Sequence, residues 1–206
     1  MNLPNSLTVA RIFLVPILVV VMLTEFPGRQ VLGLPVELAA AAIFGLASLT
    51  DWLDGYLARR RQQVTWLGQV LDPIADKLLI SATLVSLVQL ELAPAWMVAV
   101  IIGREFAVTA LRSFAHTRGI TMPASGLGKL KMVSQVVAIL LLLFGWARWP
   151  VFTELGQAAL WLVVVTALTS GVDYYRRFTR AIAAGAKVAD LASARAQRGR
   201  AARRAS

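Results

Sequence analysis

The apolar residues of this chain fall into six blocks separated by charged stretches, and this grouping constrains the fold most. The blocks cover residues 9–24, 36–50, 78–90, 96–110, 132–146 and 155–172. Several are shorter than the roughly 20 residues of a membrane span, so their helices must continue into charged residues at one end. The chain is 58% hydrophobic and only 16% charged, unlike a soluble domain. We therefore expect an all-α integral membrane protein with six transmembrane helices in one bundle.

The two ends of the chain differ from these blocks. Asn5, Ser6 and Thr8 are residue types that cap helices, which predicts an N-terminal helix lying partly in the membrane interface. No small-residue cleavage site follows the first block, so we interpret it as a membrane helix rather than a signal peptide. Residues 1–180 are assigned to one membrane domain. Residues 181–206, rich in alanine and arginine, are expected to form a basic cytoplasmic tail that is mobile or lies on the membrane surface.

The distribution of lysine and arginine predicts the orientation. If successive loops alternate between the two sides, 19 of the 21 basic residues fall on the side that holds both termini. Only Arg29 and Arg148 fall on the other side. Because cytoplasmic loops are enriched in basic residues, we expect both termini and the active site to be cytoplasmic. The composition fits a multi-pass protein of a bacterial inner membrane.

The formal net charge of +10 points to anionic partners. In so apolar a chain we favour membrane lipid and phosphorylated substrates over nucleic acid, and we expect no nucleic-acid partner. Cysteine is absent, which excludes disulfides and thiolate metal sites, and His116 is the only histidine. Any metal ion must therefore be held mainly by oxygen ligands.

Four of the eleven acidic residues fall between positions 51 and 76. Asp51 and Asp54 end the second apolar block, and Asp72 and Asp76 lead into the third. On helices, spacings of three and four residues place each pair on one face, about 60° and 40° apart. Pro73 fits either a kink or the first turn of a helix, whose N-terminus would help to hold negative charge. Since the two helices are consecutive and antiparallel, the four carboxylates are expected to converge near the membrane surface.

Four carboxylates this close cannot all stay ionised without a countercharge. Two divalent cations would neutralise them, and oxygen-only ligand sets favour Mg²⁺ or Mn²⁺. A pair of metal ions suits displacement at phosphorus because it stabilises both the attacking and the leaving oxygen. One alternative is that the aspartates are solvated, or pair with nearby arginines and Lys77. Another is a small transporter or cation channel, although the acids lie at one membrane face rather than at its centre.

The aspartates belong to a longer pattern. It reads Asp51-Trp-Leu-Asp54-Gly55-Tyr-Leu-Ala58-Arg59, eight residues, Gly68, three residues, Asp72, three residues and Asp76. This pattern resembles the signature of the CDP-alcohol phosphatidyltransferases at every defining position. Outside it, Asn5-Ser-Leu-Thr8-Val-Ala-Arg11, Gly103-Arg104-Glu105 and Gly128-Lys129-Leu-Lys131 are similar to the phosphatidylglycerophosphate synthases of that family. The resemblance covers roughly residues 5–145.

The resemblance implies the transfer of a phosphatidyl group from CDP-diacylglycerol to an alcohol, with release of CMP. It also implies six transmembrane helices, commonly a homodimer, and a site open to the cytoplasmic leaflet. The four aspartates would bind two metal ions, and Asp76 would also act as general base. The positions that it implies for binding CDP-diacylglycerol are Gly55, Ala58, Arg59, Thr65 and Gly68.

Basic residues near the ends of the last three helices point to the acceptor. They are Arg104, Arg112, Arg118, Lys129, Lys131 and Arg176. Arg104 and Arg112 are eight residues apart, about 80° on a helix, which allows them to face one pocket. Several cations favour a phosphorylated acceptor, and we expect sn-glycerol 3-phosphate. The alternatives are inositol phosphate, phosphatidylglycerol as the acceptor for cardiolipin, or basic helix ends that reflect membrane topology alone.

Overall fold

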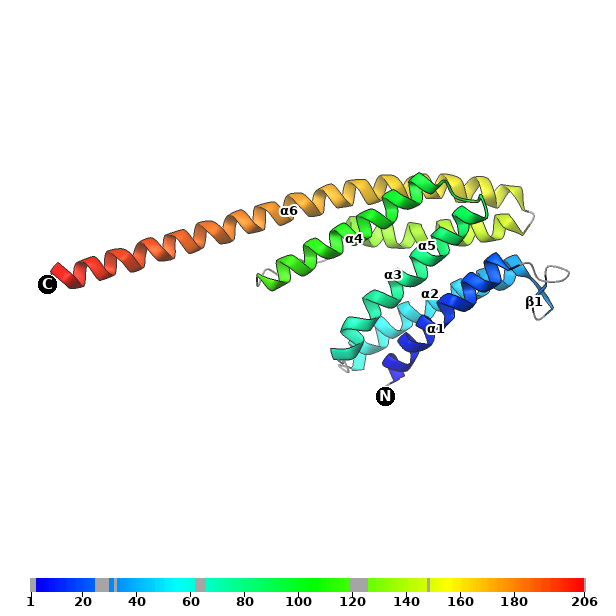
Figure 1. Ribbon diagram of the computed structural model, residues 1–206, viewed down its shortest axis with the longest axis horizontal. Helices are drawn as coiled ribbons and strands as arrows, with labels where there is room; N and C mark the ends of the chain where they lie inside the picture. Colours follow the sequence, from blue (N-terminus) through cyan, green and yellow to red (C-terminus); the bar gives the residue numbers. More distant parts are fainter. Residues whose placement is uncertain are drawn as a thin grey trace.

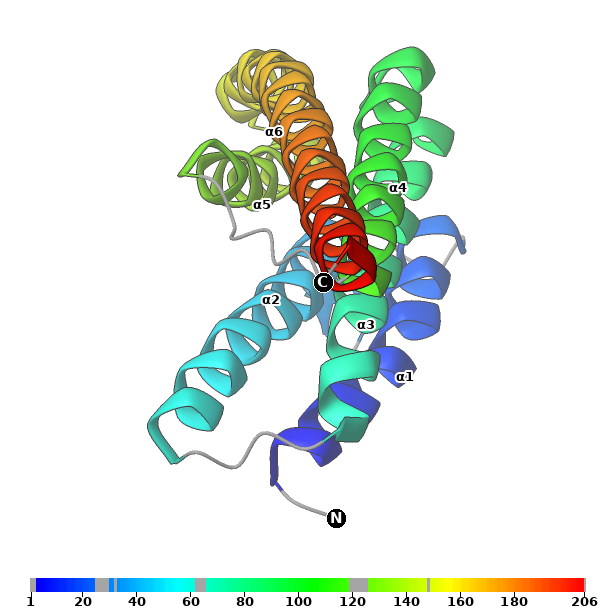
Figure 2. The ribbon, with the colours of Figure 1, turned by 90° about the vertical axis from the view of Figure 1, so that its left-hand side faces the viewer.

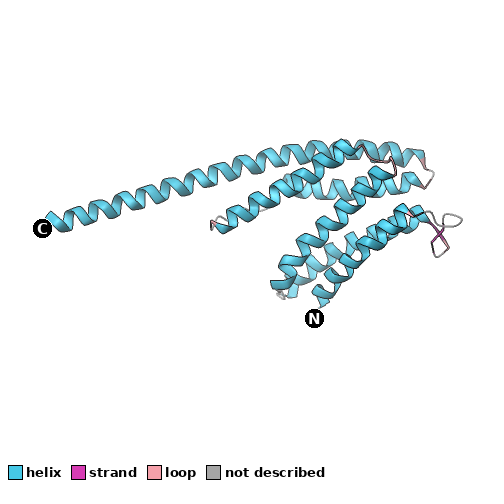
Figure 3. Cartoon of the chain, in the orientation of Figure 1, coloured by secondary structure: helices cyan, strands magenta, loops and turns pink. Residues whose placement is uncertain are grey.

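The protein is almost entirely helical in a computed structural model (Figures 1 and 3). The structure describes residues 3–24, 30–31, 33–61, 66–118, 126–147 and 149–205, and side chains within 8–24, 30–31, 33–50, 71–118, 126, 128, 130–147 and 149–183. The helices of this part are α1 Leu3–Leu23, α2 Val36–Arg61, α3 Trp66–Gln89, α4 Ala95–Thr117, α5 Gly126–Trp146 and α6 Pro150–Ala205. The expectation of a predominantly helical protein is confirmed.

A small β-ribbon lies between α1 and α2. Strand β1, Gln30–Val31, pairs antiparallel with β2, Leu34–Pro35. Gly33 in the turn has a φ of 78°, which glycine adopts without the steric cost of a side chain. Strands of two residues are too short to show an alternating pattern, so the all-α prediction missed this ribbon.

The helices pack as two groups that meet along one side (Figures 1 and 2). In one group α1 packs against α2 and α3, and in the other α6 packs along α5 and α4. Contacts of α3 with α4 and of α2 with α5 join the groups. The joined region brings side chains of α3, α4, α5 and α6 near one another.

Apolar side chains from both groups form one continuous core. Leu18 of α1, Phe44 of α2, Ile101 of α4 and Leu142 of α5 are fully buried in it. This core fixes how each helix is rotated about its axis, and therefore which polar residues face the space between the groups.

Helices α5 and α6 approach closely at two glycines. A Cβ atom on Gly145 would lie 2.6 Å from the backbone nitrogen of Thr153, and one on Gly156 would lie 2.8 Å from the side chain of Leu142. A side chain at either position would have to push the helices apart. Small residues at such contacts are typical of helix pairs packed in membranes.

Large apolar side chains also cover the outside of the helices. Phe13, Val133 and Val151 are 66%, 63% and 66% exposed. Within the described residues, one helical stretch, Pro150–Ala183, is long and apolar enough to cross a membrane. Shorter apolar stretches are Thr8–Leu23, Val36–Thr50 and Leu130–Trp146.

Helix α6 continues without a break to Ala205 and extends past the other helices (Figure 1). The predicted division at residue 180 therefore falls inside a helix. Alanine and arginine are good helix formers, which explains why this segment continues the helix. That the tail rests on lipid stays a prediction.

Candidate active site

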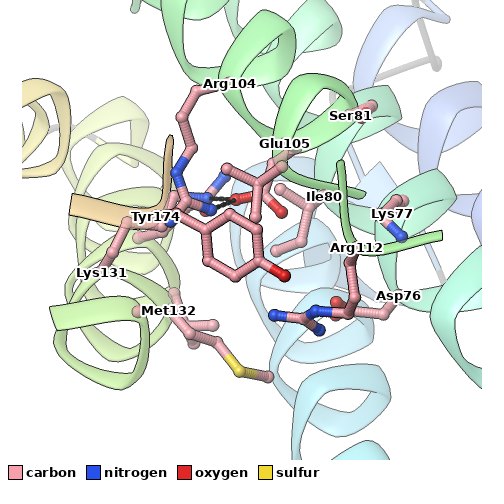
Figure 4. A pocket seen from close by; sticks show the side chains of 14 residues that line it. Asp76, Lys77, Ile80, Ser81, Arg104, Glu105, Arg112, Lys131, Met132 and Tyr174 are labelled. Carbon is pink, nitrogen blue, oxygen red and sulfur yellow. Dashed lines mark hydrogen bonds and ion pairs between the residues drawn. The ribbon is translucent and has the colours of Figure 1, made fainter. Parts of the chain in front are cut away.

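A cavity of about 250 Å³ lies where α3, α4, α5 and α6 meet (Figure 4). Its charged lining is Asp76 and Lys77 from α3, Arg104, Glu105 and Arg112 from α4, and Lys131 from α5. Uncharged polar groups come from Ser81, Gln135 and Tyr174. The cavity therefore combines carboxylates with several cations at the junction of the two helix groups.

Asp76 lies in the middle of α3, and Asp72 lies one turn earlier on the same helix. The hydroxyl of Thr8 on α1 donates a hydrogen bond of 2.5 Å to Oδ1 of Asp72. Thr8 is buried, whereas Asp72 is exposed, so the bond orients the carboxylate and leaves it accessible. The sequence indicated Thr8 as a capping residue and as part of a segment similar to the family, but its contact with Asp72 depends on the packing of α1 against α3.

Helix α3 begins at Trp66, well before the aspartates. Pro73 is therefore inside the helix, so the interpretation of Pro73 as a first-turn residue is wrong and the alternative of a kink within the helix remains. A proline removes one backbone hydrogen bond and bends a helix, but it does not have to end it.

The other predicted metal ligands lie in the last turns of α2, which is helical through Arg61. Asp51 and Asp54 are three residues apart on this helix, but their side chains lie outside the described residues. The predicted CDP-diacylglycerol-binding residues also lie outside them: Gly55, Ala58, Arg59, Thr65 and Gly68. Where side chains are described, no three residues of the types His, Cys, Asp and Glu are grouped to hold a metal ion. The donors that are described, two carboxylates one turn apart on α3, fit a hard divalent cation.

Glu105 connects three helices at the cavity wall. Its carboxylate accepts hydrogen bonds from Lys131 on α5 and, at 3.2 Å, from Nη1 of Arg104. Nη2 of Arg104 also donates to Oγ of Ser170 on α6 at 2.8 Å. The side chain of Lys131 is only 4% exposed, so it depends on Glu105 for a countercharge. Figure 4 shows both cations turned toward this carboxylate.

Arg112 reaches the cavity from the exposed side of α4. Its guanidinium carbon lies 5.7 Å from the ring centre of Tyr174 on α6, a cation–π distance. In Figure 4 its side chain points toward Asp76. Arg104 and Arg112 thus line one cavity, while their role in binding an acceptor stays a proposal.

Two predicted acceptor residues lie elsewhere in the described part of the chain. Arg118 follows α4, and its guanidinium carbon lies 4.6 Å from the ring centre of Phe114. Arg176 is exposed on α6, and neither arginine lines the cavity. The side chain of Lys129 lies outside the described residues. Membrane topology alone makes helix ends basic, so the sequence could not separate these residues from those in the cavity.

Two residues of the cavity, Gln135 and Tyr174, were not predicted from the sequence. Each is 3% exposed. Gln135 did carry a signal, because a polar residue inside an apolar membrane segment is a candidate for function. Tyr174 carried none, since tyrosine near the end of a membrane helix is common at the interface.

Known proteins similar to this chain share one activity in their names. The sequence model of the family described as CDP-alcohol phosphatidyltransferase matches residues 1–169. A CDP-diacylglycerol–glycerol-3-phosphate 3-phosphatidyltransferase of Bacillus subtilis strain 168 is 48% identical over 186 residues, which is 85% of this chain and 94% of the relative. A protein of that name from Pseudomonas fluorescens is 38% identical over 85% of this chain and 89% of its own length. One from Rickettsia bellii is 34% identical over 85% of this chain and 94% of its own length.

The matched region contains both aspartate pairs and the cavity residues of α3, α4 and α5. The family model covers well over half of the chain, and each relative is matched along nearly its whole length. The chain therefore belongs to the CDP-alcohol phosphatidyltransferase family and is an enzyme of this class.

Proposed function

We propose that this enzyme transfers the phosphatidyl group of CDP-diacylglycerol to sn-glycerol 3-phosphate, forming phosphatidylglycerophosphate and CMP. The observation that carries the proposal is a cavity in which Asp76 lies among cations that include Arg104, Arg112 and Lys131. The names of the relatives support the same acceptor. The reaction is a step of phospholipid biosynthesis.

The cations suit an acceptor that carries a phosphate monoester. Such a group bears between one and two negative charges near neutral pH, and its hydrogen bonds to arginine and lysine are stronger than bonds between neutral groups. Arg104 and Lys131 are already held by Glu105, so little side-chain freedom is lost when the acceptor binds. This arrangement favours glycerol 3-phosphate or inositol phosphate over a phosphodiester lipid such as phosphatidylglycerol.

Asp76 is the residue that we assign to proton transfer. It lies half-buried on the wall of the same cavity as the cations. In the proposed reaction it accepts the proton of the C1 hydroxyl of the acceptor. The hydroxyl oxygen then bonds to the phosphorus attached to diacylglycerol. The bond from that phosphorus to the bridging pyrophosphate oxygen breaks, and CMP leaves.

Asp51, Asp54, Asp72 and Asp76 are assigned to hold two Mg²⁺ or Mn²⁺ ions. Bound ions of this kind supply positive charge to the pyrophosphate and to the attacking and leaving oxygens. The hydrogen bond from Thr8 supports the assignment of Asp72, because ligating carboxylates are commonly oriented by a second residue. CDP-diacylglycerol is assigned to the positions that follow Asp54 in the signature: Gly55, Ala58, Arg59, Thr65 and Gly68.

We place all six helices across a bacterial inner membrane, with the cavity and both termini on the cytoplasmic side. The shortest helices have 21 residues, about 30 Å at 1.5 Å per residue, which matches the hydrocarbon core. Their exposed apolar side chains suit contact with lipid. The excess of basic residues on the cavity side supports the orientation. Because the family resemblance implies a homodimer, we include a homodimer in this proposal.

Release of CMP tests the activity and the acceptor together. Purified protein in detergent receives Mg²⁺, CDP-diacylglycerol and one acceptor at a time. We expect glycerol 3-phosphate to give the highest turnover, and EDTA to abolish CMP release. Faster turnover with inositol phosphate or phosphatidylglycerol would overturn the acceptor assignment. No CMP release with any acceptor would count against the activity itself.

The variant Asp76→Asn tests the proposed base. It removes the proton acceptor and a proposed metal ligand, so we expect kcat to fall by at least about 100-fold. Asp173→Asn is the matched control, since Asp173 lies on α6 outside the cavity lining and pairs with Arg177 at 2.9 Å. Wild-type turnover by Asp76→Asn would contradict the assignment.

A further inference from the structure

Besides Nε of Arg104, two buried polar atoms on the cavity wall have no hydrogen-bond partner among the described residues, and both belong to uncharged side chains. They are Nε2 of Gln135 and the hydroxyl of Tyr174. Both residues line the cavity and are 3% exposed. Buried polar groups in native proteins nearly always have a partner, because leaving them unpaired is costly. Two such atoms on one cavity indicate a ligand that supplies the partners.

The position of the two residues restricts what this ligand group can be. Gln135 follows Lys131 by one turn on α5, so their side chains share a helix face, about 40° apart. The ring of Tyr174 lies beside the guanidinium of Arg112 and, in Figure 4, between Lys131 and Asp76. Tyr174 therefore lies between Lys131 and the carboxylate of Asp76, and Gln135 lies on the helix face of Lys131.

We propose that Gln135 and Tyr174 bind the secondary hydroxyl at C2 of the acceptor and so select glycerol 3-phosphate. The inference rests on the proposed function, in which the cations bind the phosphate on C3 and Asp76 meets the hydroxyl on C1. Because C2 lies between these carbons, its hydroxyl falls between Lys131 and the carboxylate of Asp76. Nε2 of Gln135 donates to the hydroxyl oxygen, and the hydroxyl donates its proton to Oη of Tyr174.

An acceptor without the C2 hydroxyl measures how much these two hydrogen bonds contribute to the choice of acceptor. In 3-hydroxypropyl phosphate the attacking hydroxyl and the phosphate remain, but both buried groups stay unpaired. A site built to hydrogen-bond a hydroxyl discriminates strongly against an analogue that lacks it. We expect the wild-type enzyme to favour glycerol 3-phosphate by roughly 10- to 100-fold in kcat/KM.

Two variants remove one hydrogen-bonding group each and keep the side-chain shape. Gln135→Met preserves the length of the side chain, and Tyr174→Phe preserves the ring beside Arg112. The matched control is Gln157→Met on α6, whose amide donates to the carbonyl of Leu92 and does not line the cavity.

The readout is kcat/KM for each acceptor, measured as CMP release, in all four proteins. The preference for glycerol 3-phosphate should fall roughly tenfold in each cavity variant, because the lost hydrogen bond matters only when the C2 hydroxyl is present. Turnover of 3-hydroxypropyl phosphate and the KM for CDP-diacylglycerol should change by less than about twofold. The Gln157→Met protein should keep the wild-type preference.

A parallel loss with both acceptors, at an unchanged preference, would overturn the inference, since damaged folding lowers both rates alike. Wild-type turnover of glycerol 3-phosphate in the same experiment would leave the proposed function standing. If the wild-type enzyme released CMP only with another acceptor, the proposed function would fail and the inference with it. Should one variant fail to fold, the preference of the other decides.

Discussion

The ion pairs of Glu105 allow the structural and the binding roles of Lys131 to be separated. The side chains of Lys131, Arg104 and Glu105 are 4%, 14% and 25% exposed. Glu105→Gln would leave the ammonium group of Lys131 buried beside Arg104, with Asp76 as the negative charge that remains nearby. Breaking a buried ion pair from one side costs about 3–5 kcal/mol of the free energy of unfolding. Because Glu105 is partly exposed, we expect Glu105→Gln to lower the free energy of unfolding by about 3 kcal/mol, the lower end of this range.

Removing the lysine instead should cost less. In Lys131→Met the carboxylate of Glu105 keeps Arg104 as a partner, so we expect a loss of about 1 kcal/mol. In the double variant Glu105→Gln/Lys131→Met the charges of this pair are gone, and an uncharged pair of similar volume is often as stable as the ion pair. Arg104 keeps its hydrogen bond to Ser170, and the new amide oxygen can still accept from it. The double variant should therefore lie within about 1 kcal/mol of the wild type, a coupling of about 3 kcal/mol.

The double variant should recover stability but not catalysis. If Lys131 binds the acceptor phosphate, losing one charge-assisted hydrogen bond raises the KM for glycerol 3-phosphate roughly 10- to 150-fold in both Lys131→Met and the double variant. Titration with SDS in detergent micelles measures the free energy of unfolding, and CMP release measures KM. A double variant as unstable as Glu105→Gln would refute the ion-pair reasoning. An unchanged KM in Lys131→Met would refute the binding role.

Two further substitutions test the site and the helix packing. Thr8→Val removes the hydrogen-bond donor to Asp72. We expect weaker Mn²⁺ binding, measured by electron paramagnetic resonance, and a roughly 5- to 30-fold higher Mg²⁺ concentration for half-maximal activity. Thr8→Ser should restore both. Metal binding that is unchanged in Thr8→Val would contradict this. Gly145→Ala should destabilise the protein by about 1–3 kcal/mol, because its Cβ would lie 2.6 Å from the backbone nitrogen of Thr153. Gly103→Ala, with open space around its Cβ, should be neutral or stabilising, and equal unfolding midpoints for both would contradict the packing argument.

The helices could be predicted from the sequence, but their ends could not. Each apolar block coincides with part of one observed helix, to within a residue at the ends. The reason is that backbone N–H and C=O groups in an apolar segment must hydrogen-bond within that segment, which a helix achieves. Helix α3, however, begins at Trp66, and α6 continues to Ala205. In both cases a segment that includes polar residues extends the helix beyond the apolar run. Hydrophobicity does not predict where such an extension begins or ends.

By itself the sequence indicated the class of chemistry, because its aspartates and the small residues among them match the signature of the family, whose sequence model the chain also matches. It also supplied a pool of cations near the helix ends, but it did not rank them. Only the tertiary structure decided that Arg104, Arg112 and Lys131 line the cavity with Asp76 while Arg118 lies elsewhere. The physical reason is that this choice depends on how each helix is rotated and packed against helices distant in sequence. The same packing brings the unpaired groups of Gln135 and Tyr174 to the cavity wall, and for Tyr174 no local sequence pattern indicated this position.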